Sequence, residues 1–256
     1  MTQKERLIFL NTELLAERPD AHRFVLPESE AELFRLLRSL MNVRPARPIS
    51  DEFLKIQDEF LKEETENKGI VDISDMAEIR PDIYLWQGDI TRPRVGAIVN
   101  AANSGMTGCY YPCHGCIDNV IHTYAGVQLR IECDEIMNEQ GYPEPTGMAK
   151  ITDSYNLPCQ KVIHTVGPIV SGRLTEEHCA LLKSCYRSCL ELADKEGLDS
   201  IAFCCISTGE FHFPNEAAAH IAIDTVSRYK EETGSGIKVI FNVFKDIDLE
   251  IYKGLL

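Results

Sequence analysis

Four features are absent from the sequence, and each absence excludes a class of protein. The longest apolar run, Ile201–Ile206, is far shorter than the roughly 20 residues that a membrane helix requires. A net charge of −14 argues against general binding to nucleic-acid backbones, which favours a basic surface. Neither a GxGxxG fingerprint nor a GxxxxGK(S/T) loop occurs, so the common nucleotide motifs are excluded.

An export signal is the fourth absence. The N-terminal segment contains only the four-residue apolar patch Leu7–Leu10, which does not form a secretory signal core. We therefore expect a cytoplasmic protein with no membrane or nucleic-acid partner. Disulfides are rare in the reducing cytosol, so the ten cysteines are expected to be buried apolar residues, metal ligands or reactive thiols.

The chain divides into two parts of different character. Residues 1–74 show helical spacing, as in Glu30–Met41, and no strong strand signal. From residue 75 to 256, apolar strand candidates alternate with helical patterns, which is typical of an α/β fold around a largely parallel sheet. The predicted strands are Asp82–Gln87, Val95–Val99, Lys161–Val166, Ser200–Ile206 and Ile237–Phe244, and the predicted helices are Ile117–Asn138, Glu176–Lys195, Asn215–Glu232 and Asp246–Tyr252.

The segment that follows Val99 contains a dense group of soft metal ligands. Cys109, Cys113, His114 and Cys116 fall within eight positions, and thiolates with an imidazole favour Zn²⁺. All four residues together would form a closed structural site, whereas Cys109, His114 and Cys116 alone would leave one position open for water or substrate. The third interpretation is a loop of reduced thiols without a metal.

Two further segments lie where ligands bind in such sheets, after the ends of strands. Asp118 either caps the helix that follows or orients water and takes a proton. His122 lies one helical turn further on and either pairs with Asp118 or, as we favour, is a buried core residue. After Ile206, the loop Ser207–Phe211 offers free backbone N–H groups to a phosphate, and a helix begins just behind it.

Four short elements, taken in order, resemble the macrodomain family. Residues 88–91 resemble its GDIT element, 100–103 its NAAN element, 117–122 its VDGAIH element and 207–211 its STGxF loop. The resemblance covers residues 74–256. It implies a three-layer α/β/α macrodomain with a mixed, largely parallel sheet, preceded here by a helical N-terminal extension, and a site that binds ADP-ribose.

The segment between the second and third elements resembles the zinc-containing branch of this family. That branch carries the pattern GC-x4-H-x-C-I-D-N, which matches residues 108–119 and leaves the position of Cys113 free. The resemblance implies one Zn²⁺ per chain and the activity of a protein-ADP-ribose hydrolase. Some members are encoded beside a sirtuin that ADP-ribosylates a lipoyl-carrier protein, which implies a partner of that kind.

The resemblance also implies a role for each site residue. Asp89 would accept a hydrogen bond from the adenine amino group, Asn103 would contact the distal ribose, and Asp118 would act with Asn103 in catalysis. The implied metal ligands are Cys109, His114 and Cys116. The implied substrate-binding residues are Asp89, Ile90, Asn103, Cys116, Ile117, Asp118, Asn119, Ser207, Thr208, Gly209, Glu210 and Phe211.

The leading hypothesis is zinc-dependent removal of ADP-ribose from acidic side chains of mono-ADP-ribosylated proteins. The first alternative is a non-catalytic ADP-ribose-binding module with a structural zinc. A thiol enzyme that uses Cys109 or Cys113 as nucleophile is a further alternative, whereas the charge of −14 argues against a zinc module for nucleic acid. The N-terminal helices either cover the macrodomain or form a docking surface for the modified protein.

Overall fold

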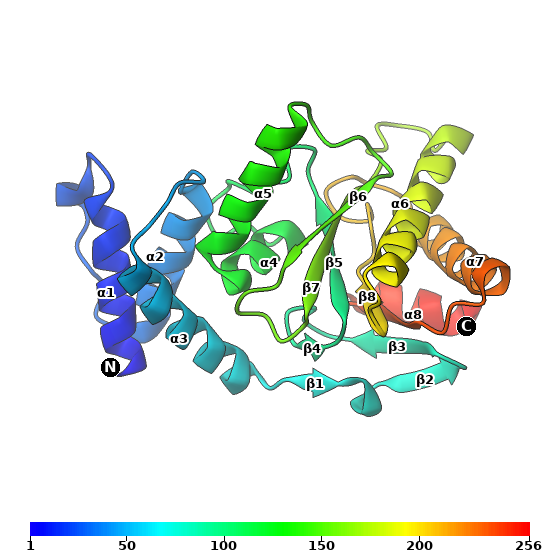
Figure 1. The fold of residues 1–256 in the computed structure, drawn as a ribbon, viewed down its shortest axis with the longest axis horizontal. Helices are drawn as coiled ribbons and strands as arrows, with labels where there is room; N and C mark the ends of the chain where they lie inside the picture. The colour runs from blue at the N-terminus through cyan, green and yellow to red at the C-terminus, as the bar shows by residue number, and fades with distance from the viewer.

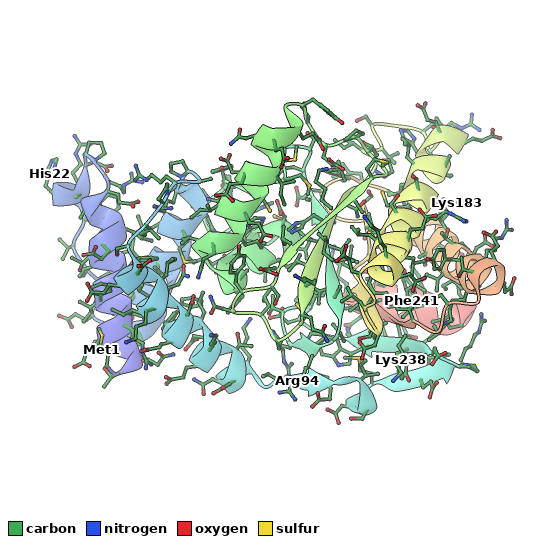
Figure 2. All side chains as sticks on the ribbon, in the orientation of Figure 1. Met1, His22, Arg94, Lys183, Lys238 and Phe241 are labelled. Carbon is green, nitrogen blue, oxygen red and sulfur yellow. The ribbon has the colours of Figure 1, made fainter.

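Three helices form the N-terminal part of the computed structural model, which describes residues 1–256 (Figure 1). Each begins where a hydroxyl side chain accepts a hydrogen bond from a backbone N–H of the first turn: Thr2, Ser29 and Ser50. Their apolar faces pack on one another in a core of their own, and Figure 2 shows Met1 and His22 at the end of the molecule opposite Lys183. The helices are α1 (Gln3–Ala16), α2 (Glu30–Val43) and α3 (Asp51–Lys68), with the short 3-10 helix η1 (Ala21–Arg23) between α1 and α2.

A seven-stranded sheet forms the centre of the remaining chain, with strand order β2-β3-β9-β8-β5-β7-β6. The five inner strands run parallel, and the two edge strands, β2 and β6, are antiparallel to their neighbours. Buried strands of this kind are covered by helices on both faces. The strands of the sheet are β2 (Ala77–Arg80), β3 (Ile83–Gln87), β5 (Ala97–Ala102), β6 (Ala149–Asp153), β7 (Lys161–Val166), β8 (Ser200–Phe203) and β9 (Lys238–Val243), while β1 (Val71–Asp72) and β4 (Pro93–Arg94) form a separate parallel pair and η2 (Ile73–Asp75) follows β1.

Helices lie on both sides of this sheet (Figure 1). One group is α4 (Ile117–Ala125) with α5 (Val127–Gln140), and the other is α6 (Glu176–Lys195), α7 (Asn215–Thr233) and α8 (Asp246–Leu255). The architecture confirms the predicted three-layer α/β/α fold with a helical N-terminal extension. The boundary between residues 74 and 75 stays a prediction.

Several predicted boundaries differ from the structure by one to three residues, as at β8, which ends at Phe203 and not at Ile206. Two differences are more consequential. Ile117–Asn138 is two helices instead of one, because Gly126 adopts a φ of +100° and the chain turns there. The strand predicted to end at Val99 continues to Ala102, because β5 keeps its parallel register with β7 as far as Ala102 and Val166. Asn100 therefore lies within the sheet, and the loop begins at Asn103.

The cysteines outside the loop after β5 fill the interior. Cys133, Cys159, Cys185, Cys189 and Cys204 are buried, while Cys179 and Cys205 are partly buried. All ten cysteines are free thiols. Among the helices, none combines the length and the apolar character that crossing a membrane requires.

Candidate functional site

A cavity of about 380 Å³ opens at the edge of the sheet where the parallel strands end. This is the edge at which α/β folds bind ligands. The loops after β3, β8 and β9 and the first turn of α4 form its walls, and the exposed ring of Phe244 lies at its border. Most of the predicted substrate-binding residues line it: Asp89, Ile90, Cys116, Ile117, Ser207, Thr208, Gly209, Glu210 and Phe211.

Asp89 lies at one end of the cavity and is held by the N-terminal extension. The ammonium group of Lys68, at the end of α3, donates to Oδ2 at 2.7 Å, and Thr91 donates to Oδ1 from its backbone N–H and its hydroxyl. Burial alone would raise the pKa of Asp89, but Lys68 and Thr91 outweigh burial and lower the pKa below its usual value. Asp89 is therefore an ionised acceptor, suited to the amino group predicted for it.

The loop after β8 presents its backbone to the cavity. Ser207 adopts a φ of +66°, and its hydroxyl is buried without a hydrogen-bond partner. Gly209 has no neighbouring atom within 4 Å of the place where a Cβ would stand, so its backbone is open to a ligand. Unused backbone N–H donors in such a turn provide the local attraction that a diphosphate needs in a protein of net charge −14.

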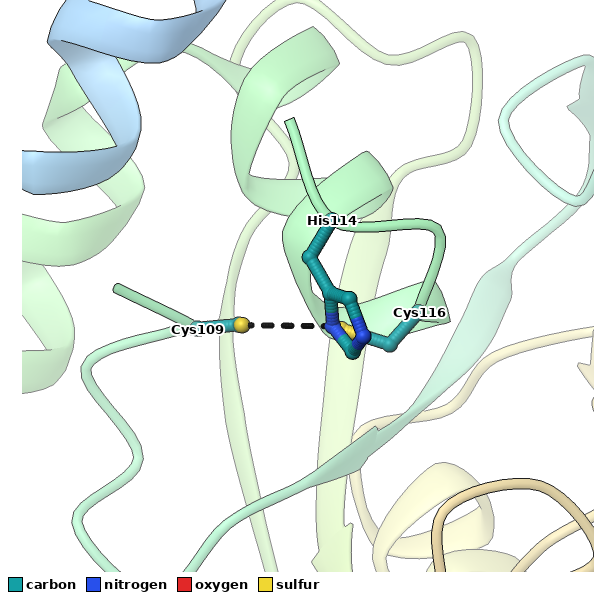
Figure 3. Close-up of side chains that lie close together, drawn as sticks. All are labelled: Cys109, His114 and Cys116. Atoms are coloured by element: carbon teal, nitrogen blue, oxygen red, sulfur yellow. Dashed lines mark hydrogen bonds between the residues drawn. The ribbon is translucent and has the colours of Figure 1, made fainter. Parts of the chain in front are cut away.

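Cys109, His114 and Cys116 converge within the segment from 107 to 116, which we call the cysteine loop. One ligand atom from each lies within 4.8 Å of the others, and Cys109 Sγ is 3.6 Å from His114 Nδ1 (Figure 3). Two sulfur ligands of a tetrahedral zinc ion stand about 3.8 Å apart for zinc–sulfur bonds of about 2.3 Å. The spacing and the soft donor set therefore fit Zn²⁺.

The fourth soft residue of the loop points elsewhere. The Cys113 thiol donates to the backbone carbonyl of Arg35 at 3.4 Å, and Cys113 is not part of the converging group. The arrangement favours the three-ligand interpretation over the closed four-ligand site. Burial, with the nearby Cys109 and Asp118, raises the pKa of the Cys116 thiol to about 12, a shift that a bound cation would reverse.

His114 also faces the loop after β8. Its Nε2 atom lies 3.7 Å from Glu210 Oε1, while its Nδ1 atom faces Cys109. Metal-binding histidines commonly donate their second ring N–H to a carboxylate, which fixes the ring. At 3.7 Å the two atoms are too far apart for a hydrogen bond, so Glu210 lies beside the second ring nitrogen without fixing the ring.

Asp118 lies directly behind the cysteine loop and is only 4% exposed. Asn100 donates to its Oδ1 at 2.8 Å, and Asn103 donates to its Oδ2 at 3.2 Å. Burial raises the pKa of the carboxyl to about 6, against the opposing effects of Asn100, Arg130 and Asn103. The side chain accepts no backbone N–H of the first helical turn, so the structure disfavours the capping interpretation of Asp118.

A buried hydrogen-bond chain supports Asp118 from within the sheet. Asn100 also donates to His164 Nδ1 at 3.1 Å, and the Nε2 atom of that ring lies 2.9 Å from the Thr152 hydroxyl. Burial lowers the pKa of His164 to about 3, so the ring is neutral, with Nε2–H as the donor to Thr152. Neither His164 on β7 nor Thr152 on β6 was predictable from sequence, because both lie on strands distant in the chain from Asp118.

His122 is buried as favoured from sequence. Its Nε2 atom lies 3.5 Å from Asp118 Oδ1, too long for a hydrogen bond, and both ring nitrogens are without a hydrogen-bond partner. Burial, with His164 and Arg130 nearby, lowers the pKa of His122 well below its usual value. The ring is therefore neutral and packs against Asp118 without forming an ion pair.

Asn119 is fully buried, and its side chain is committed to the protein. Its Nδ2 donates to the Tyr111 carbonyl at 3.0 Å, and its Oδ1 accepts from Arg38 at 2.8 Å. It does not line the cavity, nor do Asn103 and Asp118, which lie beneath the cysteine loop. Asn103, Asp118 and Asn119 are thus the three predicted substrate-binding residues that lie outside the cavity lining, where they contact the residues that line it or the loop above them.

Gly108 lies near the beginning of the cysteine loop, in a backbone conformation that favours glycine. Its φ is +84°, and a Cβ placed there would stand 2.9 Å from the His122 ring. We expect Gly108→Ala to lower the free energy of unfolding by about 2 kcal/mol, which corresponds to a fall in Tm of about 4–8 °C for a chain of this size. The matched control is Gly115→Ala in the same loop, where a Cβ meets nothing within 4 Å. An equal fall in both variants by thermal unfolding would contradict this account.

The chain belongs to the macrodomain family. Residues 99–222 match the Macro domain family. The chain is 55% identical to a protein named protein-ADP-ribose hydrolase from Treponema medium, over 100% of both chains. It is 49% identical to another of that name from Staphylococcus aureus (strain MRSA252), over 98% of this chain and 95% of the relative.

A solved macrodomain shares the fold. The structure of the Trypanosoma brucei macrodomain in complex with ADP-ribose has a TM-score of 0.66 and 29% identity, and covers 85% of this chain and 94% of that chain. The aligned region is 85% of this chain, which is more than the part that contains the sheet and its covering helices, so the similarity also includes some of the N-terminal helices. The predicted family is thereby confirmed.

Proposed function

We propose that the protein is a protein-ADP-ribose hydrolase that removes ADP-ribose from mono-ADP-ribosylated proteins with the help of zinc. The observation that carries this proposal is the position of Asp118, a buried carboxyl held by two asparagine side chains directly behind three converging soft ligands. Its similarity to proteins named protein-ADP-ribose hydrolase supports the same activity.

Binding of ADP-ribose would use the cavity from end to end. Asp89 would accept from the adenine amino group beside Ile90, and the backbone of residues 207–211 would hold the diphosphate. The first turn of α4, which Asn103 supports from behind through Asp118, would meet the distal ribose. This orientation brings the bond to the modified protein toward the cysteine loop and Asp118.

Asp118 is the residue that would handle the proton. With a pKa of about 6 its carboxyl is largely ionised at neutral pH and close to the value at which a general base is effective. Asn100 and Asn103 hold its two oxygens in one orientation. Zinc bound by Cys109, His114 and Cys116 would supply positive charge that polarises a ribose oxygen or acidifies a water molecule.

We propose an ester to an acidic side chain as the bond that is cleaved. A carboxylate leaves without prior protonation because its conjugate acid has a pKa of about 4, so one positioned base is sufficient. A nitrogen leaving group would need a general acid as well, as the second carboxyl provides in glycosidases. Asp118 is the buried carboxyl next to the three proposed zinc ligands. One such base is sufficient for an ester, whereas a nitrogen leaving group would also need a general acid.

The physiological substrate and compartment belong to the same proposal. Some members of the zinc-containing branch that the sequence resembles are encoded beside a sirtuin, and we propose a sirtuin-modified lipoyl-carrier protein as partner. We propose the cytoplasm as the compartment, which the ten free thiols support.

The test is release of ADP-ribose by the full chain from three substrates: a lipoyl-carrier protein modified on an acidic residue, another protein modified on an acidic residue, and a protein modified on arginine. We expect turnover of both acidic-residue substrates, faster for the carrier, and none of the arginine substrate. Tight binding of ADP-ribose without any turnover would support the alternative, a non-catalytic binding module. Equal turnover of the arginine substrate would contradict the ester specificity.

A further inference from the structure

Helix α2 of the N-terminal extension lies against the cysteine loop. The two segments are far apart in sequence, yet α2 packs on α4, the helix that begins directly after the loop. Side chains of α2 contact the loop near its end, and Arg130 of α5 links the beginning of the loop to the C-terminus of α2. These contacts are directional hydrogen bonds to backbone groups, which constrain where the loop lies.

The contact near the end of the loop is made by Arg38. Its guanidinium donates to the backbone carbonyl of His114 at 2.6 Å and to Asn119 Oδ1 at 2.8 Å. Asn119 in turn donates to the carbonyl of Tyr111 at 3.0 Å. Arg38 thus holds the backbone of His114, a proposed zinc-binding residue, directly. Through Asn119 it also holds the backbone of Tyr111, which precedes His114 in the loop.

Asn42 makes the next contact, one helical turn further along α2. Its side-chain oxygen accepts from the backbone N–H of Cys113 at 2.9 Å, and its amide donates to the Thr123 hydroxyl on α4. The thiol of Cys113 donates to the carbonyl of Arg35. Cys113 adopts a φ of +54°, so these bonds hold the loop in a backbone conformation that it would otherwise avoid.

Arg130 ties the beginning of the loop to the C-terminus of α2. One guanidinium nitrogen donates to the carbonyls of Met41 and Asn42 at 2.9 and 2.8 Å, which the end of a helix leaves without partners. Another nitrogen donates to the carbonyl of Thr107 at 2.7 Å, two residues before Cys109. Arg130 is buried, so water competes little for these bonds.

We propose that α2 is a positioning element for the zinc site, with Arg38 as its principal residue. The inference deepens the proposed function and rests on it, since it presumes that the three ligands bind zinc. The long loop needs such support because four residues lie between Cys109 and His114 and six between Cys109 and Cys116, and they include a strained backbone turn at Cys113. An extension that orders this loop before the metal arrives reduces the entropy lost on binding.

The test compares Arg38→Met with Arg35→Met in the full chain. Both substitutions remove one positive charge from α2, but the Arg35 side chain is exposed and makes no hydrogen bond or ion pair, whereas Arg38 makes three hydrogen bonds. The measurements are the Kd for Zn²⁺ by competition with a chromophoric chelator, and the Tm of the metal-free proteins. Arg38→Gln serves as a second variant, since its shorter side chain also loses the contacts.

We expect the Kd for Zn²⁺ to rise about 10-fold or more in both Arg38 variants and to stay at the wild-type value in Arg35→Met, with similar Tm values for the metal-free proteins. Excess Zn²⁺ should restore hydrolysis in the Arg38 variants, because their ligands and Asp118 are intact. Tight zinc binding by wild type with an unchanged Kd in both Arg38 variants would overturn the positioning role and leave the proposed function standing. Absence of zinc binding by wild type would overturn both.

Discussion

Replacing Asp118 with asparagine is expected to slow the release of ADP-ribose from a modified protein by about 10²–10⁴-fold, the usual contribution of a general base. Asparagine keeps the shape of the side chain but cannot accept a proton at neutral pH. The loss should appear in kcat, because a general base acts in the transition state and not in the binding of ADP-ribose. The measurement is the initial rate of ADP-ribose release at saturating substrate.

The matched control is Asp134→Asn, the same substitution on α5, where the carboxylate accepts only from Asn138. Titration calorimetry with free ADP-ribose completes the experiment, since a variant that keeps its affinity while losing turnover has lost chemistry and not binding. An Asp118→Asn protein with a rate within a few-fold of wild type would show that another group takes the proton.

The fold was predictable because its signals are local. Buried parallel strands form continuous apolar runs, as in Lys161–Val166, and the alternation of such runs with helical patterns defines the class. The strand β6 was missed because Ala149–Asp153 alternates polar residues at an antiparallel edge of the sheet, where no continuous run is required. Gly126 was missed as a helix break because a lone glycine is also tolerated inside a helix.

The candidate site was predictable only in part, for a related reason. Motifs close together in sequence, such as the loop that carries Cys109 and His114, indicated which residue types are present. The contacts that fix them come from distant segments: Arg38 from α2, Lys68 from α3 and His164 from β7. No periodicity or spacing reports a contact between residues so far apart in the chain, so the supporting residues required the fold.

Replacing His114 with alanine is expected to abolish stoichiometric zinc binding and to lower hydrolysis by more than about 100-fold, since changes in residues that merely support ligands already cost 10–100-fold. Loss of the imidazole leaves two thiols, too few to hold the ion in an open site. Zinc is measured by elemental analysis of the purified protein, and hydrolysis by release of ADP-ribose.

Cys113→Ser is the control that makes this result specific. Cys113 is the other soft residue of the same loop, but its thiol faces the carbonyl of Arg35 and not the three converging ligands. We therefore expect Cys113→Ser to keep one zinc per chain and near wild-type turnover, which would also exclude Cys113 as a nucleophile. Loss of zinc in Cys113→Ser would instead favour the closed four-ligand site, whereas full activity in His114→Ala would remove zinc from the mechanism and leave Asp118 to act without it.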